Sequence, residues 1–324
     1  MLALRHVNSA AKCRLLGALF TSIQLAIHGT ASAGMSAIGS RKLVAMVCEG
    51  IYQRHFVSSL CASFDVVGIV VYKPVAPKSG FVQRLQRLLG FRSAMRFLRS
   101  RLALREESKY SAPLMAKLFQ NDSQSITYPL DVPLLEVSNI NDVAVATFLQ
   151  RHQPDVVCIN GTNLLREDLL RLAPLIPYGF VNLHTGLSPY ARGGNCDLFM
   201  LLEGRPEFVG ITIHHIDSGI DSGDIILTAR PDLLPGDNYA MIEAKSFHLG
   251  NRMMVVAVSQ LFEGRAARVK QWQHGKEFLR RTGYVYDPFV RLQVNEILKN
   301  GLVAAYLADK GARDKSIRLV GEQA

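Results

Sequence analysis

Asn182 and His184 stand two positions apart at the end of an apolar run. On an extended strand, residues at i and i+2 point to the same side, so these two side chains could share one substrate atom. Several carboxylates follow in the acid-rich turn 217–224. An amide that donates to an oxyanion, an imidazole that exchanges a proton near neutral pH and a carboxylate that orients the imidazole suit acyl transfer without a protein nucleophile.

Each of these residue types also has a structural explanation. Asp217 and Asp224 flank Asp221 and are expected to cap the turn, with Asp217 as the alternative carboxylate if the register differs. His214 and His215 are neighbours, so a strand would place them on opposite faces and no more than one could join His184. No metal site is therefore predicted.

The elements that must position these residues alternate along the chain. Continuous apolar runs predict strands buried on both faces, as in a parallel sheet covered by helices. Strands are expected at 43–47, 65–71, 132–137, 155–159, 180–183 and 209–216, and helices at 52–62, 141–151 and 167–173. This order predicts an α/β fold with a doubly wound, Rossmann-like parallel sheet, whose ligands bind at the carboxyl ends of the strands.

Composition limits the class of protein. Of the 324 residues, 48% are apolar and 20% charged, which excludes disorder as the main state. The net charge of +10 favours an anionic partner. The five cysteines form no C-x-x-C pair, which argues against a disulfide framework or a thiolate metal site and favours a reduced, cytoplasmic protein. The sequence contains no apolar run long enough for a membrane-spanning helix.

Three parts of different character follow one another. Residues 1–40 lack acidic side chains and loosely resemble a secretory signal, but we expect a disordered extension or an over-long gene start, with Met35 as the alternative initiator. Residues 41–275 are expected to form the catalytic domain, and residues 276–324 a short helical C-terminal tail.

A basic insertion, residues 78–109, lies between the second and third predicted strands. It holds nine Lys or Arg residues against two Glu, a net charge of +7. Leucines at helical spacing between the arginines predict an amphipathic pair of helices broken at Gly90. Either its apolar stripe packs on the core, or the insertion contacts an anionic or membrane surface.

Three blocks, 154–165, 179–194 and 210–226, resemble the 10-formyltetrahydrofolate-dependent formyltransferases. That family includes methionyl-tRNA formyltransferase, glycinamide ribonucleotide transformylase and the sugar N-formyltransferases. The resemblance extends over roughly residues 42–276. It implies the formyltransferase fold and formyl transfer from 10-formyltetrahydrofolate to a primary amine, by direct attack through a tetrahedral intermediate. It also implies a catalytic triad at Asn182, His184 and Asp221.

The resemblance further implies where the two substrates bind. Backbone groups of two loops hold the pterin in relatives, and the loop after the catalytic His lies by the acceptor. The implied folate-binding residues are Gly161, Thr162, Asn163, Leu164, Leu165, Ile216, Asp217, Gly219 and Ile220, and the implied acceptor-binding residues are Pro189, Tyr190, Arg192 and Gly193. The sequence departs from the family at Gly186, where a Ser is usual.

The expected acceptor is an amino-sugar nucleotide. Cys48-Glu49-Gly50 stands where glycinamide ribonucleotide transformylase has a Gly-Ser-rich phosphate loop. Methionyl-tRNA formyltransferase adds a C-terminal barrel, for which residues 276–324 are expected to be too few. Formyltetrahydrofolate deformylase, another relative, has an extra N-terminal domain, for which residues 1–40 are expected to be too few. Activity like that of methionyl-tRNA or glycinamide ribonucleotide formyltransferases remains the alternative.

A hypothesis of another class is a non-catalytic basic adaptor that binds a membrane or nucleic acid through residues 78–109. The expected partners of the enzyme are a small-molecule amine and an anionic or membrane surface at the basic insertion. Nucleic acid is not favoured, and a homodimer is left open.

Overall fold

The computed structural model describes residues 41–74, 91–119 and 126–321. The predicted extension 1–40 and the first part of the basic insertion, residues 78–90, lie outside these ranges. The elements described below all belong to one unit, Lys42–Ala324.

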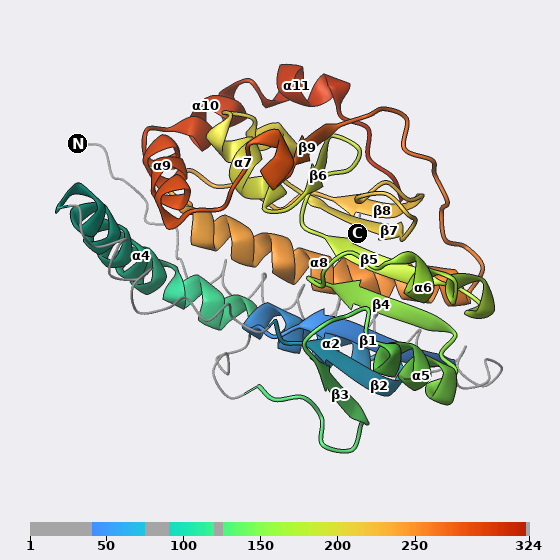
Figure 1. Cartoon of the computed structure of the whole chain (residues 1–324). Coiled ribbons are helices and arrows are strands. Elements are labelled where there is room, and N and C mark those ends of the chain that lie inside the picture. Colours follow the sequence, from blue (N-terminus) through green and yellow to red (C-terminus); the bar gives the residue numbers. More distant parts are fainter. Residues whose placement is uncertain (1–40, 75–90, 120–125, 322–324) are drawn as a thin grey trace, which may run out of the picture. The chain divides into compact units, whose positions relative to one another are not determined.

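A seven-stranded sheet forms the centre of this unit (Figure 1). Its strands lie in the order β3-β2-β1-β4-β5-β7-β8. In chain order they are β1 (Lys42–Cys48), β2 (Asp65–Tyr72), β3 (Leu134–Val137), β4 (Val156–Asn160), β5 (Phe180–His184), β7 (Ile211–His215) and β8 (Ile225–Ala229). The five strands from β3 to β5 are parallel to one another.

Side chains of β1 alternate between two buried clusters. Leu43, Ala45 and Val47 belong to the cluster on one face of the sheet, and Val44 and Met46 to the cluster on the other. All five are fully buried. A strand covered on both faces needs apolar residues at every position, which explains the continuous apolar run in the sequence.

The far edge of the sheet is antiparallel. β7 pairs antiparallel with β5, and β8 pairs antiparallel with β7. An apolar run predicts that a strand is buried, but it does not give the strand's direction. The prediction of an α/β fold with a doubly wound sheet is thus confirmed, and the sheet is mostly parallel, with two antiparallel strands at one edge.

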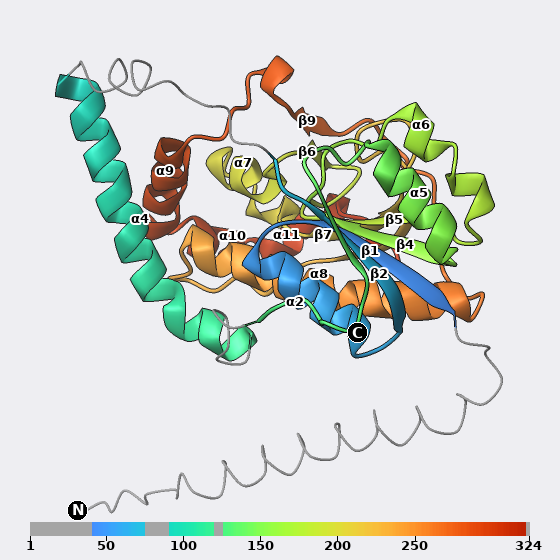
Figure 2. The same cartoon turned by 60° about the horizontal axis from the view of Figure 1, so that its bottom comes forward.

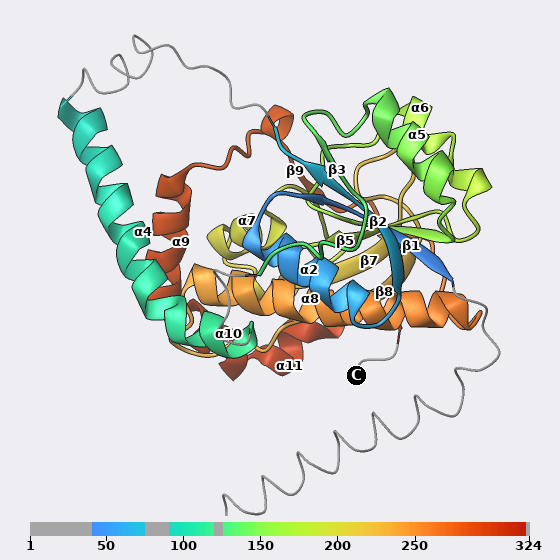
Figure 3. The ribbon, with the colours of Figure 1, turned by 90° about the horizontal axis from the view of Figure 1, so that it is seen from below.

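Helices cover both faces (Figures 1 and 3). α2 (Ile51–Cys61) and α8 (Tyr239–Phe262) pack on one face, and α5 (Val143–His152), α6 (Glu167–Leu170) and the 3-10 turn η1 (Ala173–Leu175) pack on the other. The sequence analysis predicted α2, α5 and α6 but did not predict α8 or β8. α8 is the longest helix on the sheet, and its N-cap residue Asn238 accepts a hydrogen bond from the Met241 amide.

The rest of the chain packs beyond the antiparallel edge. α7 (Cys196–Leu202) contacts α9 (Pro288–Lys299), and α10 (Leu302–Ala308) contacts α9. The short strands β6 (Ala191–Gly193) and β9 (Lys276–Phe278) form a separate two-stranded sheet. The remaining elements are α11 (Lys310–Arg313) and the 3-10 turns η2 (Pro206–Phe208), η3 (Arg280–Thr282) and η4 (Asp314–Ser316). The tail is helical, as expected, and also supplies β9.

The described part of the basic insertion lies in one long helix, α4 (Phe91–Leu118), which continues past the predicted limit at residue 109. It packs on α8 and α9, and Figure 2 shows it beside α9. The expected first helix of the pair, before Gly90, lies outside the described residues. None of the helices within the described ranges is long and apolar enough to cross a membrane.

Candidate functional site

The three residues singled out from the sequence lie together where β5 and β7 meet the loop 217–224. The Asp221 carboxylate lies between Asn182 and His184: Oδ1 is 3.5 Å from Asn182 Nδ2, and Oδ2 is 3.5 Å from His184 Nδ1. Both partners come from β5, with one residue between them. The strand therefore places an amide and an imidazole on the same side, as the two-residue spacing predicts.

Asp221 is ionised in this arrangement. Burial by itself would raise the pKa of the carboxyl group, but His184, His214 and the Gly193 amide outweigh it and hold the pKa well below its ordinary value. The Gly193 N–H donates to Oδ2 over 2.9 Å. A buried carboxylate with several donors is a fixed negative charge, suited to stabilising a positive charge that develops beside it.

His214 also belongs to this cluster, and the sequence analysis did not predict it as a catalytic residue. It lies opposite Asn182 in the antiparallel pairing of β5 with β7. Its Nε2 is 3.2 Å from Asn182 Nδ2 and 3.5 Å from Asp221 Oδ1. Its Nδ1 faces the His215 carbonyl oxygen at 2.8 Å, which places a proton on Nδ1 and leaves Nε2 directed toward Asn182 and Asp221.

His184 lies behind Asp221, with only 6% of its surface exposed. Its Nε2 contacts the Ala191 carbonyl oxygen at 3.2 Å and Cys196 Sγ at 3.6 Å. Burial lowers the pKa of His184, although Asp221 opposes this effect. Burial also raises the pKa of the Cys196 thiol well above its ordinary value, so this Cys-His-Asp arrangement lacks a thiolate nucleophile.

Gly186 makes room for the His184 ring. A Cβ atom at this position would lie 2.3 Å from His184 Nε2 and 2.7 Å from Cys196 Cβ. The departure from the usual Ser thus has a steric reason in this chain: the imidazole and Cys196 occupy the space that a side chain at position 186 would need.

The loop after β7 holds Asp221 through its own turn contacts. Asp217 accepts hydrogen bonds from the Gly219 amide at 3.0 Å and from the Ser222 hydroxyl at 2.7 Å, as expected for a turn-capping residue. A Cβ on Gly223 would lie 1.9 Å from the His215 carbonyl oxygen, so only glycine allows the loop to return this close to β7. Asp221 has a φ of +45°, in the left-handed region.

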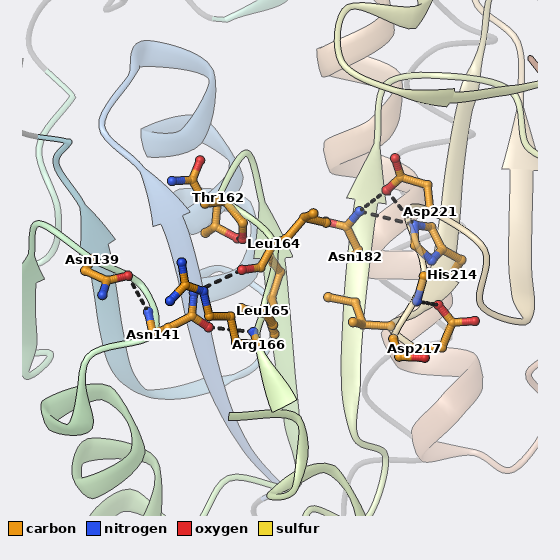
Figure 4. A pocket seen from close by; sticks show the side chains of 15 residues that line it. Asn139, Asn141, Thr162, Leu164, Leu165, Arg166, Asn182, His214, Asp217 and Asp221 are labelled. Carbon is orange, nitrogen blue, oxygen red and sulfur yellow. Dashed lines mark hydrogen bonds and ion pairs between the residues drawn. The ribbon is translucent and has the colours of Figure 1, made fainter. Parts of the chain in front are cut away.

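A cavity of about 550 Å³ opens beside this cluster (Figure 4). Asn182, His214 and Asp221 form one wall, and His184 is not among the residues that line it. The other walls hold seven of the residues implied for folate binding, namely Thr162, Asn163, Leu164, Leu165, Ile216, Asp217 and Gly219. Gly161 and Ile220 belong to the same two loops but do not line the cavity.

Asn141, which also lines the cavity, holds the loop 161–165 in place. Its side chain donates to the Leu164 carbonyl at 3.0 Å and accepts from the Arg166 amide at 2.6 Å. Within the described ranges, the backbone N–H groups of 162–165 have no hydrogen-bond partner. A braced loop with open backbone amides at a cavity wall fits a planar, hydrogen-bonding ring such as a pterin.

The residues implied for acceptor binding have partners within the chain. The Tyr190 hydroxyl donates to the Ser316 carbonyl at 3.2 Å, and its ring stacks on Phe208. Arg192 is buried and donates to Gln271 Oε1 at 2.7 and 3.0 Å. Neither these two residues nor Pro189 and Gly193 line the cavity, so an acceptor role for the four stays a prediction.

The loop after β1 does not resemble a phosphate site. The Glu49 carboxylate pairs with Arg54 and Lys73 just before α2 begins. The side chain of Gln53 fills the space over Gly50 and donates to Asn160 at 2.8 Å. A negatively charged residue directly before the N-cap of α2 disfavours a phosphate at this helix terminus.

Among the described residues, no group of three or more His, Cys, Asp or Glu side chains is arranged to hold a metal ion. The four cysteines in the described ranges, Cys48, Cys61, Cys158 and Cys196, are free thiols.

Part of the chain is similar to known proteins. Residues 106–258 match the formyl transferase family. The curated methionyl-tRNA formyltransferase of Syntrophus aciditrophicus is 29% identical over 141 residues, which is 43% of this chain and 44% of that protein. The chain thus spans less than half the length of this relative.

Two solved structures are similar at low sequence identity. Phosphoribosylglycinamide formyltransferase from Anaplasma phagocytophilum has a TM-score of 0.48 at 14% identity, over 74% of this chain and 99% of that one. A 4-N formyltransferase from Francisella tularensis has a TM-score of 0.45 at 16% identity, over 74% and 76%.

The segment that matches the formyl transferase family is residues 106–258. It contains Asn182, His184, His214 and Asp221 together with both loops at the cavity. The resemblance inferred from three sequence blocks is therefore confirmed.

Proposed function

We propose that this protein transfers a formyl group from 10-formyltetrahydrofolate to a primary amine. The observation that carries the proposal is the ionised Asp221, held between His184 and His214 beside Asn182 at the wall of the cavity. The family supports the same reaction. The donor supplies an activated formyl carbon, and loops 162–165 and 216–219 would hold its ring system.

The residues of the chain can then be given roles. The Asn182 N–H that faces His214 Nε2 at rest must turn to the oxygen that becomes negative when the amine attacks, and donates to it there. Nε2 of His214 lines the cavity and can take up the proton that the attacking amine loses, and Asp221 stabilises the resulting imidazolium. The imidazolium can then return this proton to the donor nitrogen as the bond between that nitrogen and the formyl carbon breaks, which releases tetrahydrofolate and the formylated amine. His184 orients Asp221 from behind. Its predicted direct contact with the oxyanion needs Nε2 to leave the Ala191 carbonyl.

The proposed acceptor is an amino-sugar nucleotide. Support comes from the β1–α2 loop, where Glu49 and Gln53 take the place of a phosphate-binding loop of the glycinamide ribonucleotide type. The proposed location is the cytoplasm, where a folate-dependent enzyme meets its donor.

The test is an assay of tetrahydrofolate release with a panel of aminodeoxysugar nucleotides, and product mass reports the gain of one formyl group. Asp221→Asn should lower kcat by about 10²- to 10⁴-fold, because the fixed charge is lost while the shape is kept. The matched control is Asp224→Asn in the same loop, whose carboxylate pairs with Arg268 at the surface.

The outcomes separate the two parts of the proposal. If no amine yields a formylated product, formyl transfer itself is excluded. If glycinamide ribonucleotide or methionyl-tRNA yields the only product, the reaction stands and the acceptor is wrong.

A further inference from the structure

α4 has one face turned to the body of the protein. Ser100, Glu107 and Ser111 recur at intervals of seven and four residues and are buried. Residues at this spacing lie on one side of a helix. This inner face packs on α8 and α9.

Polar contacts anchor the inner face. Glu107 Oε2 accepts from Arg291 Nε of α9 at 2.8 Å, and Oε1 accepts from the Ala240 amide in the first turn of α8 at 2.9 Å. Arg291 also pairs with Glu243 at 3.3 Å and lies over the Tyr239 ring at 4.7 Å. Because these groups are largely buried, they fix which side of α4 faces outward.

The opposite face carries an apolar stripe. Met95, Leu98 and Leu102 are spaced by three and four residues, so they lie in line along the helix. Their exposed fractions are 42%, 51% and 54%. An apolar stripe aligned on the solvent side of a helix differs from scattered exposed leucines, and it indicates a surface that binds something.

Exposed basic side chains border this stripe. Arg99 and Arg105 lie on its two sides, and Lys109 continues its line one to two turns further on. Glu106 is the one acidic residue on this face among the described residues of α4, and it pairs with Lys109 at 3.3 Å. The outer face is therefore apolar along its centre and positive along its margins.

We propose that the outer face of α4 binds an anionic membrane surface, with the helix lying in the plane of the interface. Apolar side chains between basic ones can enter the lipid boundary while the cations meet lipid phosphates. A second copy of the chain on this face would bring its like charges together. A nucleic acid would pair with the cations but leave the apolar stripe in water.

The position of α4 agrees with this role. Figures 1 to 3 show α4 beside α9 and away from α5 and α6. Asn141 and Leu165, which line the cavity, lie on the chain next to α5 and α6. A protein bound to a membrane through α4 thus keeps this side of the cavity free.

The test is co-sedimentation of the full chain with vesicles of phosphatidylcholine alone or of equal parts phosphatidylcholine and phosphatidylglycerol. We expect binding to the anionic vesicles only, and weaker binding as salt is raised. Arg99→Gln with Arg105→Gln should weaken the partitioning roughly tenfold or more, because two cations leave the surface. Leu98→Asn with Leu102→Asn should weaken it to a similar extent.

Two matched pairs of variants serve as controls. Arg151→Gln with Lys299→Gln removes the same charge from α5 and α9, and Leu175→Asn with Leu234→Asn removes two exposed leucines elsewhere. Both pairs should bind vesicles like the wild type. Unchanged circular dichroism and unfolding midpoints in all variants establish that folding is intact.

Three results would overturn the proposal: equal binding to neutral vesicles, wild-type binding by both α4 variants, or a self-association that Leu98→Asn with Leu102→Asn abolishes. Binding of labelled RNA or DNA that needs Arg99 and Arg105, without binding to vesicles, would replace the membrane by nucleic acid. Each readout is independent of formyl transfer.

Discussion

Asp221 occupies a backbone conformation that residues with a side chain rarely adopt. Its φ of +45° costs about 1 kcal/mol relative to the right-handed region. The loop maintains it through the Gly193 amide and the close return of Gly223 to β7. This backbone strain lowers the stability of the fold but places the Asp221 carboxylate at the cavity wall. Such a cost is typical of residues whose position serves a function.

Gly186→Ser, which restores the side chain usual in the family, should disturb this site. The new Cβ meets His184 Nε2 at 2.3 Å, so the imidazole must move away from its place behind Asp221. We expect stability to fall by about 1–3 kcal/mol through overpacking and kcat/KM to fall about 10²-fold through misplacement. Urea unfolding and the formyl-transfer assay measure the two effects.

Gly194→Ser is the matched control, because a Cβ at this position meets nothing within 4 Å. It should leave both quantities close to the wild-type values. If Gly186→Ser behaves in the same way, the steric reason given for Gly186 is wrong.

The sequence predicts part of the candidate site, for identifiable reasons. Asn182 and His184 share a side because strand geometry repeats every two residues. Asp221 was reached only through the resemblance to a family, since its contact with β5 depends on the path of a loop. His214 was missed as a catalytic candidate because its place opposite Asn182 follows from an antiparallel pairing that no local pattern reveals.

At the scale of elements, Glu107 connects three helices, since it joins α4 to Arg291 of α9 and to the first turn of α8. Glu107→Gln should lower the free energy of unfolding by about 3 kcal/mol, because Arg291 loses a buried partner. Urea denaturation followed by circular dichroism measures the change.

The neighbouring variant Glu106→Gln provides the comparison. Its carboxylate is 73% exposed and pairs with Lys109 in the same helix, so the change should stay within about 0.5 kcal/mol. Equal effects of the two variants would mean that the Glu107 contacts do not hold α4 to the body.

The predictable elements are those with a local signal. The strands β1, β2 and β4 were predicted because they are almost entirely apolar. The start of α5 was predicted because its N-cap residue Asp142 accepts a hydrogen bond from the Ala144 amide. α8 was missed although it is the longest helix on the sheet. It is buried against the sheet on one side and against α2 and α4 on others, so its apolar residues are not confined to one stripe.

For the molecule as a whole, a buried carboxyl group and a partly buried imidazole give the free energy of unfolding opposite dependences on pH. Burial lowers the pKa of His215 to about 4, and burial raises the pKa of Asp197 to about 7. Between pH 4 and 6.5 the unfolded chain protonates His215 while the folded chain does not, so stability rises with pH. Over nearly the same window only the folded chain protonates Asp197, so stability falls with pH.

Single variants should separate these two opposing slopes. Asp197→Asn keeps the hydrogen bonds with Ser246 and the Gly210 amide but removes the titration. Its stability should therefore rise with pH more steeply than that of the wild type, by up to about 1.4 kcal/mol per pH unit. His215→Gln should have the opposite effect, reduced because its ring is partly exposed. Unfolding free energies measured from pH 4 to 8 test both, and parallel curves for all three proteins would refute the assignment.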